Sequence, residues 1–240
     1  SNNSVSVYLN RTNQSRLSGN DIIGGGRGIS LNESYGSYVA NNTAISSTYG
    51  IELFSSGNNT ISSNSFNYSS AGAFIQNSDN NSMESNIFMN NTQRGVYLLN
   101  SNHNTLINNT AANNTINGAY LEDSSNNTLR YNDFFDNMNY GIFMEGDSDQ
   151  NNLTGNTFNS RYTSYYDLSI SPSSAGQNNV WLNSFYSAGV YDRGTATVYC
   201  INNSGNFYDE SIDYLSIGNG TGESGTTIGG DCGPSNLTSP

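Results

Sequence analysis

A short segment of the form Gly-apolar-x-apolar returns along the chain at an almost constant interval. Successive copies are 22 or 23 residues apart, and they begin at Gly28, Gly50, Gly72, Gly95, Gly118 and Gly141. Between the copies lies a polar turn, often NNT or NNS, followed by an asparagine that stands between apolar residues. Self-similarity at a fixed period is the signature of a solenoid, in which each repeat packs on its neighbours.

Each repeat has room for two short alternating strands but not for a helix of useful length. The sequence therefore predicts an all-β fold, a parallel β-helix of about eight coils of 22–24 residues over residues 1–188. Equivalent strands of adjacent coils would lie about 4.8 Å apart, so that like residues form columns along the axis. Residues 189–240, which are rich in glycine, are expected to form an irregular C-terminal cap.

One asparagine per coil is expected to form a buried ladder, because a turn amide can bond to the backbone and to the amides above and below it. The column comprises Asn20, Asn42, Asn64, Asn86, Asn109, Asn132, Asn156 and Asn183.

Charge excludes several classes of partner. The chain has 7 basic and 19 acidic side chains, a net charge of -12, and no lysine. Nucleic acids and anionic membrane surfaces are bound through clustered Lys and Arg, so neither is an expected partner. The chain also lacks an apolar run of about 18 residues that would insert into a membrane.

The two cysteines, Cys200 and Cys232, lie in the C-terminal quarter, where no further Cys or His offers a metal ligand. One disulfide is therefore favoured over a metal site, and secretion is the simplest setting. The chain begins at Ser1 directly before a strand-like segment, which suggests a mature, processed N-terminus.

The GIYL-like segments and the NNTI..N.F segments over about residues 5–190 resemble the right-handed parallel β-helix repeat of NosD-type and archaeal cell-surface proteins. The segment from Gly205 to Asp209 is similar to the closing segment of those proteins, although it lacks their Asp-Gly-x-Gly-Asp run. The resemblance implies an exported β-helix. It also implies an extracellular location at the cell surface of an archaeon.

The x position of the repeated segment should point away from the core. It carries four consecutive aromatic residues, the predicted contact stripe of Phe74, Tyr97, Tyr120 and Phe143. Three interpretations stay open. The stripe can be a self-stabilising stack, a surface for lateral packing of subunits, or a surface on which sugars stack.

Alignment of the coils brings acidic residues together on adjacent turns. Such a cluster can bind calcium through oxygen ligands, can position two carboxylates for glycoside chemistry, or can simply keep the turn solvated. The candidate calcium ligands are Glu122, Asp123, Glu145, Asp147 and Asp149. His103 is the single histidine, so no catalytic triad can be built on it. We therefore expect neither an enzyme nor a required cofactor.

Many N-x-S/T sequons lie in the polar turns and are candidate sites for covalent N-glycans. They include Asn10, Asn32, Asn58, Asn67, Asn80, Asn90, Asn108, Asn113, Asn126, Asn152, Asn202, Asn219 and Asn236.

These observations together favour an extracellular structural glycoprotein that assembles with copies of itself into a cell-surface layer, sheath or filament. An open first coil would expose unpaired strand edges and recruit another chain. Two alternatives from other classes remain. One is a polysaccharide-active enzyme such as a lyase, epimerase or glycosidase, and the other is a glycan-binding adhesion module.

Overall fold

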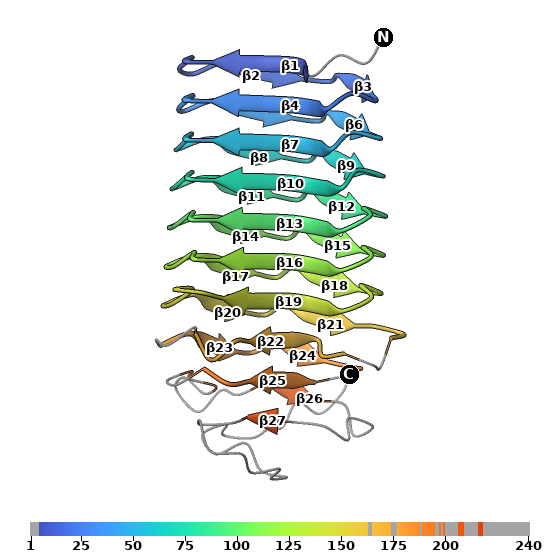
Figure 1. Cartoon of the computed structure of the whole chain (residues 1–240), viewed down its shortest axis with the longest axis vertical. Coiled ribbons are helices and arrows are strands. Elements are labelled where there is room, and N and C mark those ends of the chain that lie inside the picture. The colour runs from blue at the N-terminus through green and yellow to red at the C-terminus, as the bar shows by residue number, and fades with distance from the viewer. Residues whose placement is uncertain are drawn as a thin grey trace.

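The computed structural model is a right-handed parallel β-helix of about eight coils, each of about 23 residues (Figure 1). It describes residues 5–162, 165–173, 177–187, 189–194, 197, 199, 206–208 and 216–217, and no helix occurs among them. The fold class predicted from the repeat is thereby confirmed.

The coils form three parallel sheets that run the length of the molecule. The ten-stranded sheet, which faces the viewer in Figure 1, comprises β1 (Val5–Asn10), β4 (Arg27–Asn32), β7 (Tyr49–Phe54), β10 (Ala71–Gln76), β13 (Arg94–Leu99), β16 (Asn117–Glu122), β19 (Tyr140–Glu145), β22 (Leu168–Ile170), β25 (Val190–Asp192) and β27 (Ser216–Ile217).

Two sheets of shorter strands complete the coil. The eight-stranded sheet comprises β2 (Arg16–Ser18), β5 (Tyr38–Ala40), β8 (Thr60–Ser62), β11 (Ser82–Glu84), β14 (Thr105–Ile107), β17 (Thr128–Arg130), β20 (Asn152–Thr154) and β23 (Asn179–Trp181). The nine-stranded sheet comprises β3 (Asp21–Ile23), β6 (Thr43–Ile45), β9 (Ser65–Asn67), β12 (Ile87–Met89), β15 (Thr110–Ala112), β18 (Asp133–Phe135), β21 (Thr157–Asn159), β24 (Ser184–Phe185) and β26 (Phe207–Tyr208).

Each coil thus has three strands, and the expectation of two is wrong. The segment around each column asparagine is split into two strands because the residue before the asparagine adopts a left-handed backbone conformation. Ser63, for example, has φ of 55° and lies between β8 and β9, and Asn108 has φ of 53° between β14 and β15. A left-handed residue ends one strand and turns the chain into the next.

Apolar side chains from all three sheets fill the interior of the coil as columns. Phe158 and Phe185 lie in register on β21 and β24, and their ring centroids are 4.8 Å apart. Leu98 and Leu121 lie in register on the ten-stranded sheet and are both fully buried. Stacking of like residues explains why the apolar positions of the repeat recur so regularly.

Buried asparagines bond from coil to coil. The side-chain amide of Asn86 donates to Oδ1 of Asn109 at 3.0 Å and to the carbonyl of Ile61 at 2.9 Å. The same pattern continues from Asn20 to Asn183 and on to Asn206. Each amide satisfies backbone groups in the turn that would otherwise be buried without a partner.

The structure contains further ladders with the same period. A second asparagine ladder comprises Asn59, Asn81, Asn104, Asn127, Asn151 and Asn178, and a third comprises Asn91, Asn114 and Asn137. A serine ladder comprises Ser34, Ser56, Ser78, Ser101, Ser124 and Ser148.

Most of the expected C-terminal cap lies outside the described residues, and so do Cys200 and Cys232. The division at residue 189 and the disulfide therefore stay predictions. Within the described part of the chain, no helix has the length and apolar character needed to cross a membrane.

Candidate functional site

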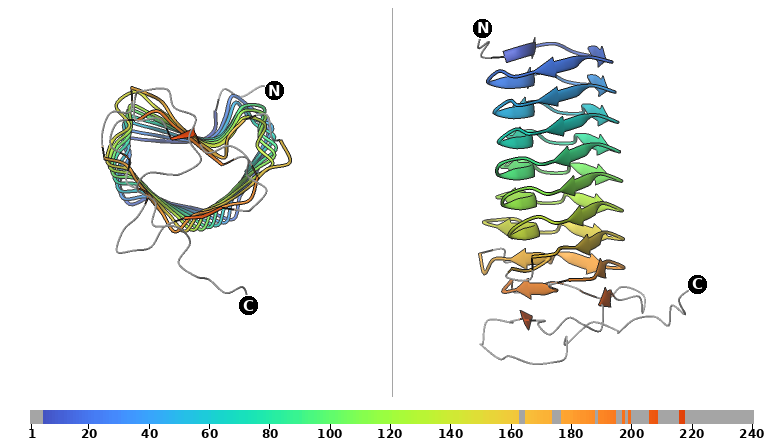
Figure 2. Two further views of the ribbon diagram at one scale, coloured as in Figure 1. Left: turned by 90° about the horizontal axis from the view of Figure 1, so that it is seen from below. Right: turned by 90° about the vertical axis from the view of Figure 1, so that its right-hand side faces the viewer.

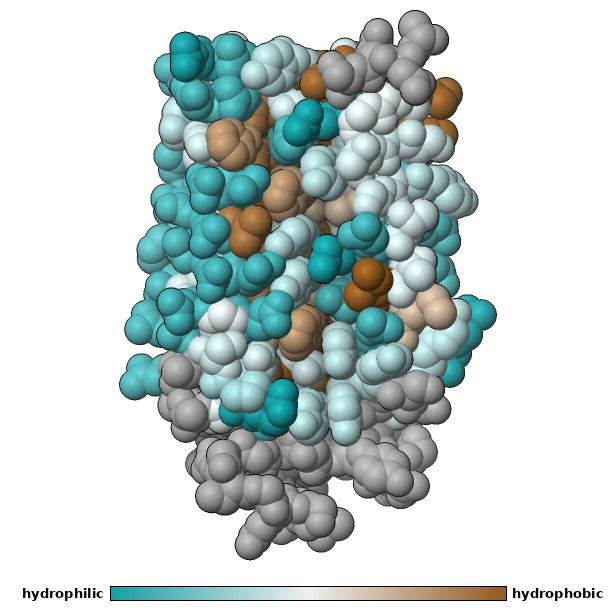
Figure 3. All heavy atoms as spheres, viewed as in Figure 1, coloured by the Kyte–Doolittle hydropathy of each residue, from teal (hydrophilic) through white to brown (hydrophobic). Residues whose placement is uncertain are grey.

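The ten-stranded sheet is bent inward, which gives the coil an indented outline when it is viewed along the axis (Figure 2). In the six-residue strands β4, β7, β10, β13 and β16 the second and third residues are both buried, as Gly28 and Ile29 are in β4, so that the strand bends there. The first and fourth residues consequently lie on either side of the bend. The bend repeats in successive coils and produces a groove on this face, in which apolar side chains lie between polar ones (Figure 3).

The floor of the groove is the predicted contact stripe. The ring centroids of Phe74 and Tyr97 are 5.0 Å apart, those of Tyr97 and Tyr120 are 4.9 Å apart, and those of Tyr120 and Phe143 are 5.4 Å apart. The rings pack on one another and Tyr120 is only 5% exposed. Each ring of the stripe has much of its two faces covered by the rings of the neighbouring coils. A ligand bound in the middle of the stripe would therefore contact the edges of the rings and the polar groups beside them.

Side chains from the first position of the strands fold over this aromatic column. Tyr49 lies 4.8 Å from Phe74, and Tyr140 lies 5.1 Å from Phe143, centroid to centroid. Between them, the guanidinium carbon of Arg94 lies 4.7 Å from the ring centroid of Tyr97. Arg94 makes no ion pair with a carboxylate among the described residues. A guanidinium held by π systems in this way retains its charge for an incoming group.

Two tyrosines of the stripe hold two glutamates at the edge of the groove. The hydroxyl of Tyr97 donates to Oε2 of Glu122, and the hydroxyl of Tyr120 donates to Oε1 of Glu145. Glu122 and Glu145 lie in register on β16 and β19. Burial, reinforced by these hydrogen bonds to carboxylates, raises the pKa of both tyrosines well above the usual value. At neutral pH the phenols are therefore hydrogen-bond donors and not bases.

The five predicted calcium ligands do not converge. Glu122 and Glu145 are on strands and bond to tyrosines, whereas Asp123 lies in the turn after β16 and accepts a hydrogen bond from the backbone amide of Asp147 at 3.0 Å. No three of the Asp, Glu, His and Cys residues described by the structure are placed to hold a metal ion. The carboxylates on the strands and those in the turns are thus held by different partners, although alignment of the coils places them on adjacent turns.

Sequence reasoning missed the basic residues of the groove. Arg27 and Arg94 both occupy the first position of a repeated segment, directly before its glycine, and Arg27 pairs with Glu52 at 2.6 Å. Because both arginines occupy the same position of the repeat, alignment of the coils could have placed them on one face of the sheet. Their contact with side chains at the fourth position of the strand could not be predicted, since it depends on the bend.

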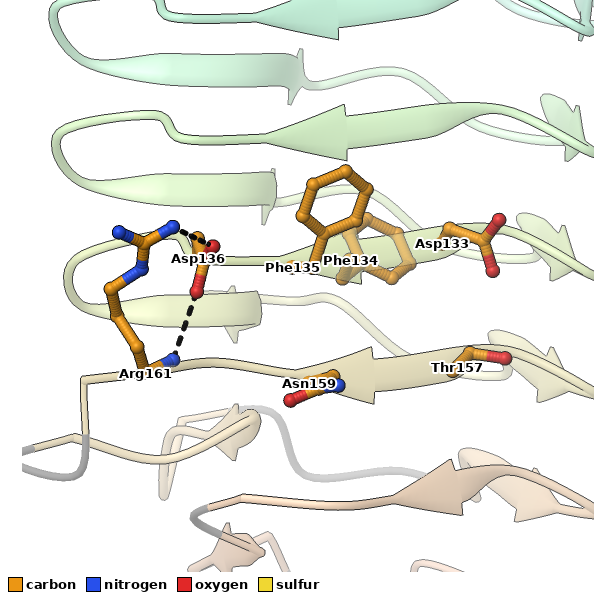
Figure 4. A pocket seen from close by; sticks show the side chains of 7 residues that line it. All are labelled: Asp133, Phe134, Phe135, Asp136, Thr157, Asn159 and Arg161. Carbon is orange, nitrogen blue, oxygen red and sulfur yellow. Dashed lines mark hydrogen bonds and ion pairs between the residues drawn. The ribbon is translucent and has the colours of Figure 1, made fainter.

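A second hollow, of about 450 Å³, lies on the nine-stranded sheet (Figure 4). Arg161 forms an ion pair with Asp136 at 2.5 Å at one side of it, which lowers the pKa of the Asp136 carboxyl. Phe135 lies over the outer surface of β18, while Phe134 packs in the core behind it. Arg161, the cation at this hollow, is thus already paired, while Asp133 at the other side forms no ion pair among the described residues.

The predicted sequons lie partly in turns and partly at strand ends, where Asn10, Asn32, Asn67 and Asn152 are found. Asn10, Asn58, Asn80, Asn108 and Asn126 are exposed. Asn32, Asn67, Asn90, Asn113 and Asn152 are half-buried, and Asn202, Asn219 and Asn236 lie outside the described residues. Modification at these positions and self-association stay predictions.

Solved structures with the same fold include enzymes and a binding domain. A variant of the periplasmic alginate epimerase AlgG has a TM-score of 0.61 and 20% identity over 80% of this chain and 47% of its own. The A-module of the Azotobacter vinelandii mannuronan C-5 epimerase AlgE4 has a TM-score of 0.65 and 14% identity, over 86% of this chain and 58% of its own. The receptor-binding domain of the siphovirus 9NA tailspike has a TM-score of 0.54 and 11% identity, over 88% of this chain and 53% of its own. The chain thus spans about half the length of these structures.

These similarities correct two expectations from the sequence. A self-assembling structural glycoprotein of the cell surface was expected, and no enzyme. The comparisons contradict both expectations, because the similar structures include alginate epimerases. At 14% and 20% identity the likeness itself shows the fold. The comparison favours the polysaccharide-active alternative.

A family model described as periplasmic copper-binding protein (NosD) matches residues 1–211. No curated protein matches the chain. Copper is bound by imidazole, thiolate and thioether groups. His103 is alone on an exposed turn, and the described residues contain no group of three His, Cys, Asp or Glu side chains that could hold a metal ion. Of the four methionines, Met83 and Met144 are fully buried in the core, Met89 is half-buried and Met138 is exposed. These residues do not fit a copper site.

The match covers most of the chain, and the repeat that carries it builds the described β-helix. The match does not show the archaeal cell-surface class that the resemblance implied. The chain belongs to the NosD family.

Proposed function

We propose that this protein is exported and acts on a polysaccharide that lies in the groove of the ten-stranded sheet. The observation that carries the proposal is the arrangement of Glu122 and Glu145, each held by a tyrosine hydroxyl, in the same groove as Arg94, which forms no ion pair among the described residues. Export is supported by the periplasmic description of the family and of AlgG.

The two carboxylates supply the acid and base chemistry. Equivalent atoms of adjacent parallel strands lie about 4.8 Å apart, which is close to the separation of about 5–5.5 Å between the paired carboxyl groups of many retaining glycosidases. Tyr97 and Tyr120 fix the orientation of these carboxylates, since each phenol stays protonated and keeps donating its hydrogen bond. The carboxylate oxygens that do not bond to tyrosine can accept protons from a substrate.

Arg94 provides the positive charge of the groove centre. Its guanidinium can bind a carboxylate of an acidic sugar, or stabilise negative charge that develops on a substrate oxygen during the reaction. The aromatic column beneath it excludes water from one side of this charge, which strengthens its interaction with an anion.

The test is a screen of purified protein against acidic and neutral polysaccharides, read out by reducing ends, unsaturated products and NMR for epimerised sugars. We expect at least one polysaccharide to be converted, and we expect Glu122→Gln and Glu145→Gln to lower the rate by about 100-fold or more. Glu84→Gln is the matched control, because Glu84 is exposed on the eight-stranded sheet. Full activity in both groove variants would refute the assigned roles, and the absence of any conversion would refute the proposed function.

A further inference from the structure

The aromatic column of the groove is interrupted near its N-terminal end. Ser30 and Glu52 occupy the position at which the next four coils carry aromatic rings, and Tyr8 occupies the same position in the first coil. The missing ring volume leaves a hollow of about 500 Å³ in the groove. A hollow of this size falls within the range of small-molecule sites.

The floor of the hollow is a charged pair set beneath the surface. Nε of Arg27 lies 2.6 Å from Oε2 of Glu52, and the Ser30 hydroxyl donates to the same oxygen at 2.9 Å. The Glu52 side chain is 9% exposed and that of Arg27 is 42% exposed. Oε1 of Glu52 accepts no hydrogen bond from the described residues, so the floor offers an acceptor from Glu52 next to guanidinium donors from Arg27.

The walls of the hollow are aromatic and amide side chains. Tyr8 is 54% exposed and Phe54 is 38% exposed. Phe54 stands in register between Asn32 and Gln76 on the neighbouring strands. An exposed ring between two amides offers an apolar surface for the C–H face of a sugar and polar groups for its hydroxyls.

We propose that this hollow binds one neutral sugar unit of the glycan in the groove. Adjacent hydroxyls of a pyranose donate to Glu52 and accept from Arg27, while Phe54 packs on the ring. Arg27 already forms an ion pair with Glu52, so an acidic sugar would find no cation free of an ion pair here, whereas Arg94 forms none among the described residues. The inference rests on the proposed function, since it assigns a subsite of the same groove.

The experiment measures binding of short neutral oligosaccharides of glucose, xylose, mannose or galactose by saturation-transfer NMR and calorimetry, with uronate oligosaccharides alongside. We expect a neutral oligosaccharide to bind, and Phe54→Ala to weaken its binding about tenfold, which corresponds to about 1.4 kcal/mol. Glu52→Gln should weaken binding as well. Tyr38→Ala is the matched control, because Tyr38 is also 38% exposed but lies on β5 of another sheet.

The inference is overturned if no neutral oligosaccharide binds, if only uronate oligosaccharides bind, or if Phe54→Ala and Tyr38→Ala have equal effects. Two further outcomes distinguish failure of this inference from failure of the proposed function. Conversion of a polysaccharide with no effect of Phe54→Ala on binding would sink the subsite alone. Binding that depends on Phe54, without conversion of any polysaccharide, would sustain the subsite and sink the catalytic roles of Glu122 and Glu145.

Discussion

The guanidinium carbon of Arg94 lies 4.5 Å from the ring centroid of Tyr120, on the following coil. The same carbon lies 4.7 Å from the ring centroid of Tyr97 on its own coil. One cation therefore spans two rungs of the aromatic column and connects adjacent coils at the centre of the groove.

Substitution of Arg94 should affect both stability and binding. We expect Arg94→Gln to lower the free energy of unfolding by about 1 kcal/mol, because two cation–π contacts are lost, and to weaken binding of an acidic polysaccharide about tenfold. Urea unfolding and affinity electrophoresis measure the two effects. Arg130→Gln is the control, since Arg130 is exposed on the eight-stranded sheet. Equal loss of binding in the two variants would show only an effect of net charge.

Alkaline pH should destabilise the groove. The folded-state pKa of Tyr97 and that of Tyr120 are raised by burial and by their hydrogen bonds to Glu122 and Glu145. A raised pKa stabilises the fold below the pKa of an unfolded tyrosine, about 10, and this stabilisation is lost as pH rises through the folded-state pKa. We therefore expect the free energy of unfolding to fall above about pH 10.

The double variant Tyr97→Phe/Tyr120→Phe should lose less stability over the same alkaline range. Urea unfolding at a series of pH values measures this, and an absorbance titration follows ionisation of the phenols. Tyr68→Phe, at an exposed tyrosine on another part of the coil, serves as the control. An unchanged alkaline profile in the double variant would contradict the assignment.

Loss of one rung from the first asparagine ladder should be costly. Asn86 is 1% exposed, and its side chain accepts from the backbone and amide of Asn64 and donates to Ile61 and Asn109. Asn86→Ala leaves these buried groups without partners, so we expect a loss of about 3 kcal/mol in the free energy of unfolding. Thr115→Ala, at an exposed turn position, should change it by less than about 0.5 kcal/mol. A cost for Asn86→Ala no larger than that of Thr115→Ala would show that the ladder does not stabilise the coil.

Replacement of the glycine of the repeated segment, even by alanine, should lower the free energy of unfolding. A Cβ at Gly118 would lie 2.6 Å from the carbonyl oxygen of Gly141 and 2.6 Å from Cδ1 of Phe134. Because backbone and core must both shift, we expect Gly118→Ala to cost about 3 kcal/mol by thermal or urea unfolding. Gly19→Ala should cost about 1 kcal/mol, since nothing lies within 4 Å of its Cβ position and only its φ of 69° opposes the substitution. Similar costs at the two glycines would contradict the crowding argument.

Much of the architecture follows from the repeat itself. The period of 22 or 23 residues, the glycine column and the asparagine column were sufficient to predict a parallel β-helix. The same period also contains the serine column from Ser34 to Ser148 and the other asparagine columns, which a full alignment of the coils would have revealed. The third strand was missed although Gly19, Asn41, Asn108 and Gly155, at the position equivalent to Ser63, are of the types that favour a left-handed backbone. Ser63, Ser85, Tyr131 and Leu182 at the same position give no such sign.

The site was less accessible to sequence reasoning. The stripe from Phe74 to Phe143 could be read from alternation, and the structure places its rings in one stack. The partners of the stripe could not be read, since Arg94 contacts rings three residues away on its own strand and one coil further on. The five acidic residues were grouped by alignment of the coils, which correctly places Glu122 beside Glu145, but the hydrogen-bond partners of the strand and turn residues differ.

The sequence by itself determined which residues stack, because identical strand registers at a constant period place like residues above one another. Only the tertiary structure decided which other side chains each column contacts. The ten-stranded sheet bends where Gly118 and its equivalents pack against the next coil, and this bend turns the first and fourth positions toward each other. Side-chain contacts across a bend depend on the path of the backbone in three dimensions, which periodicity along one dimension does not contain.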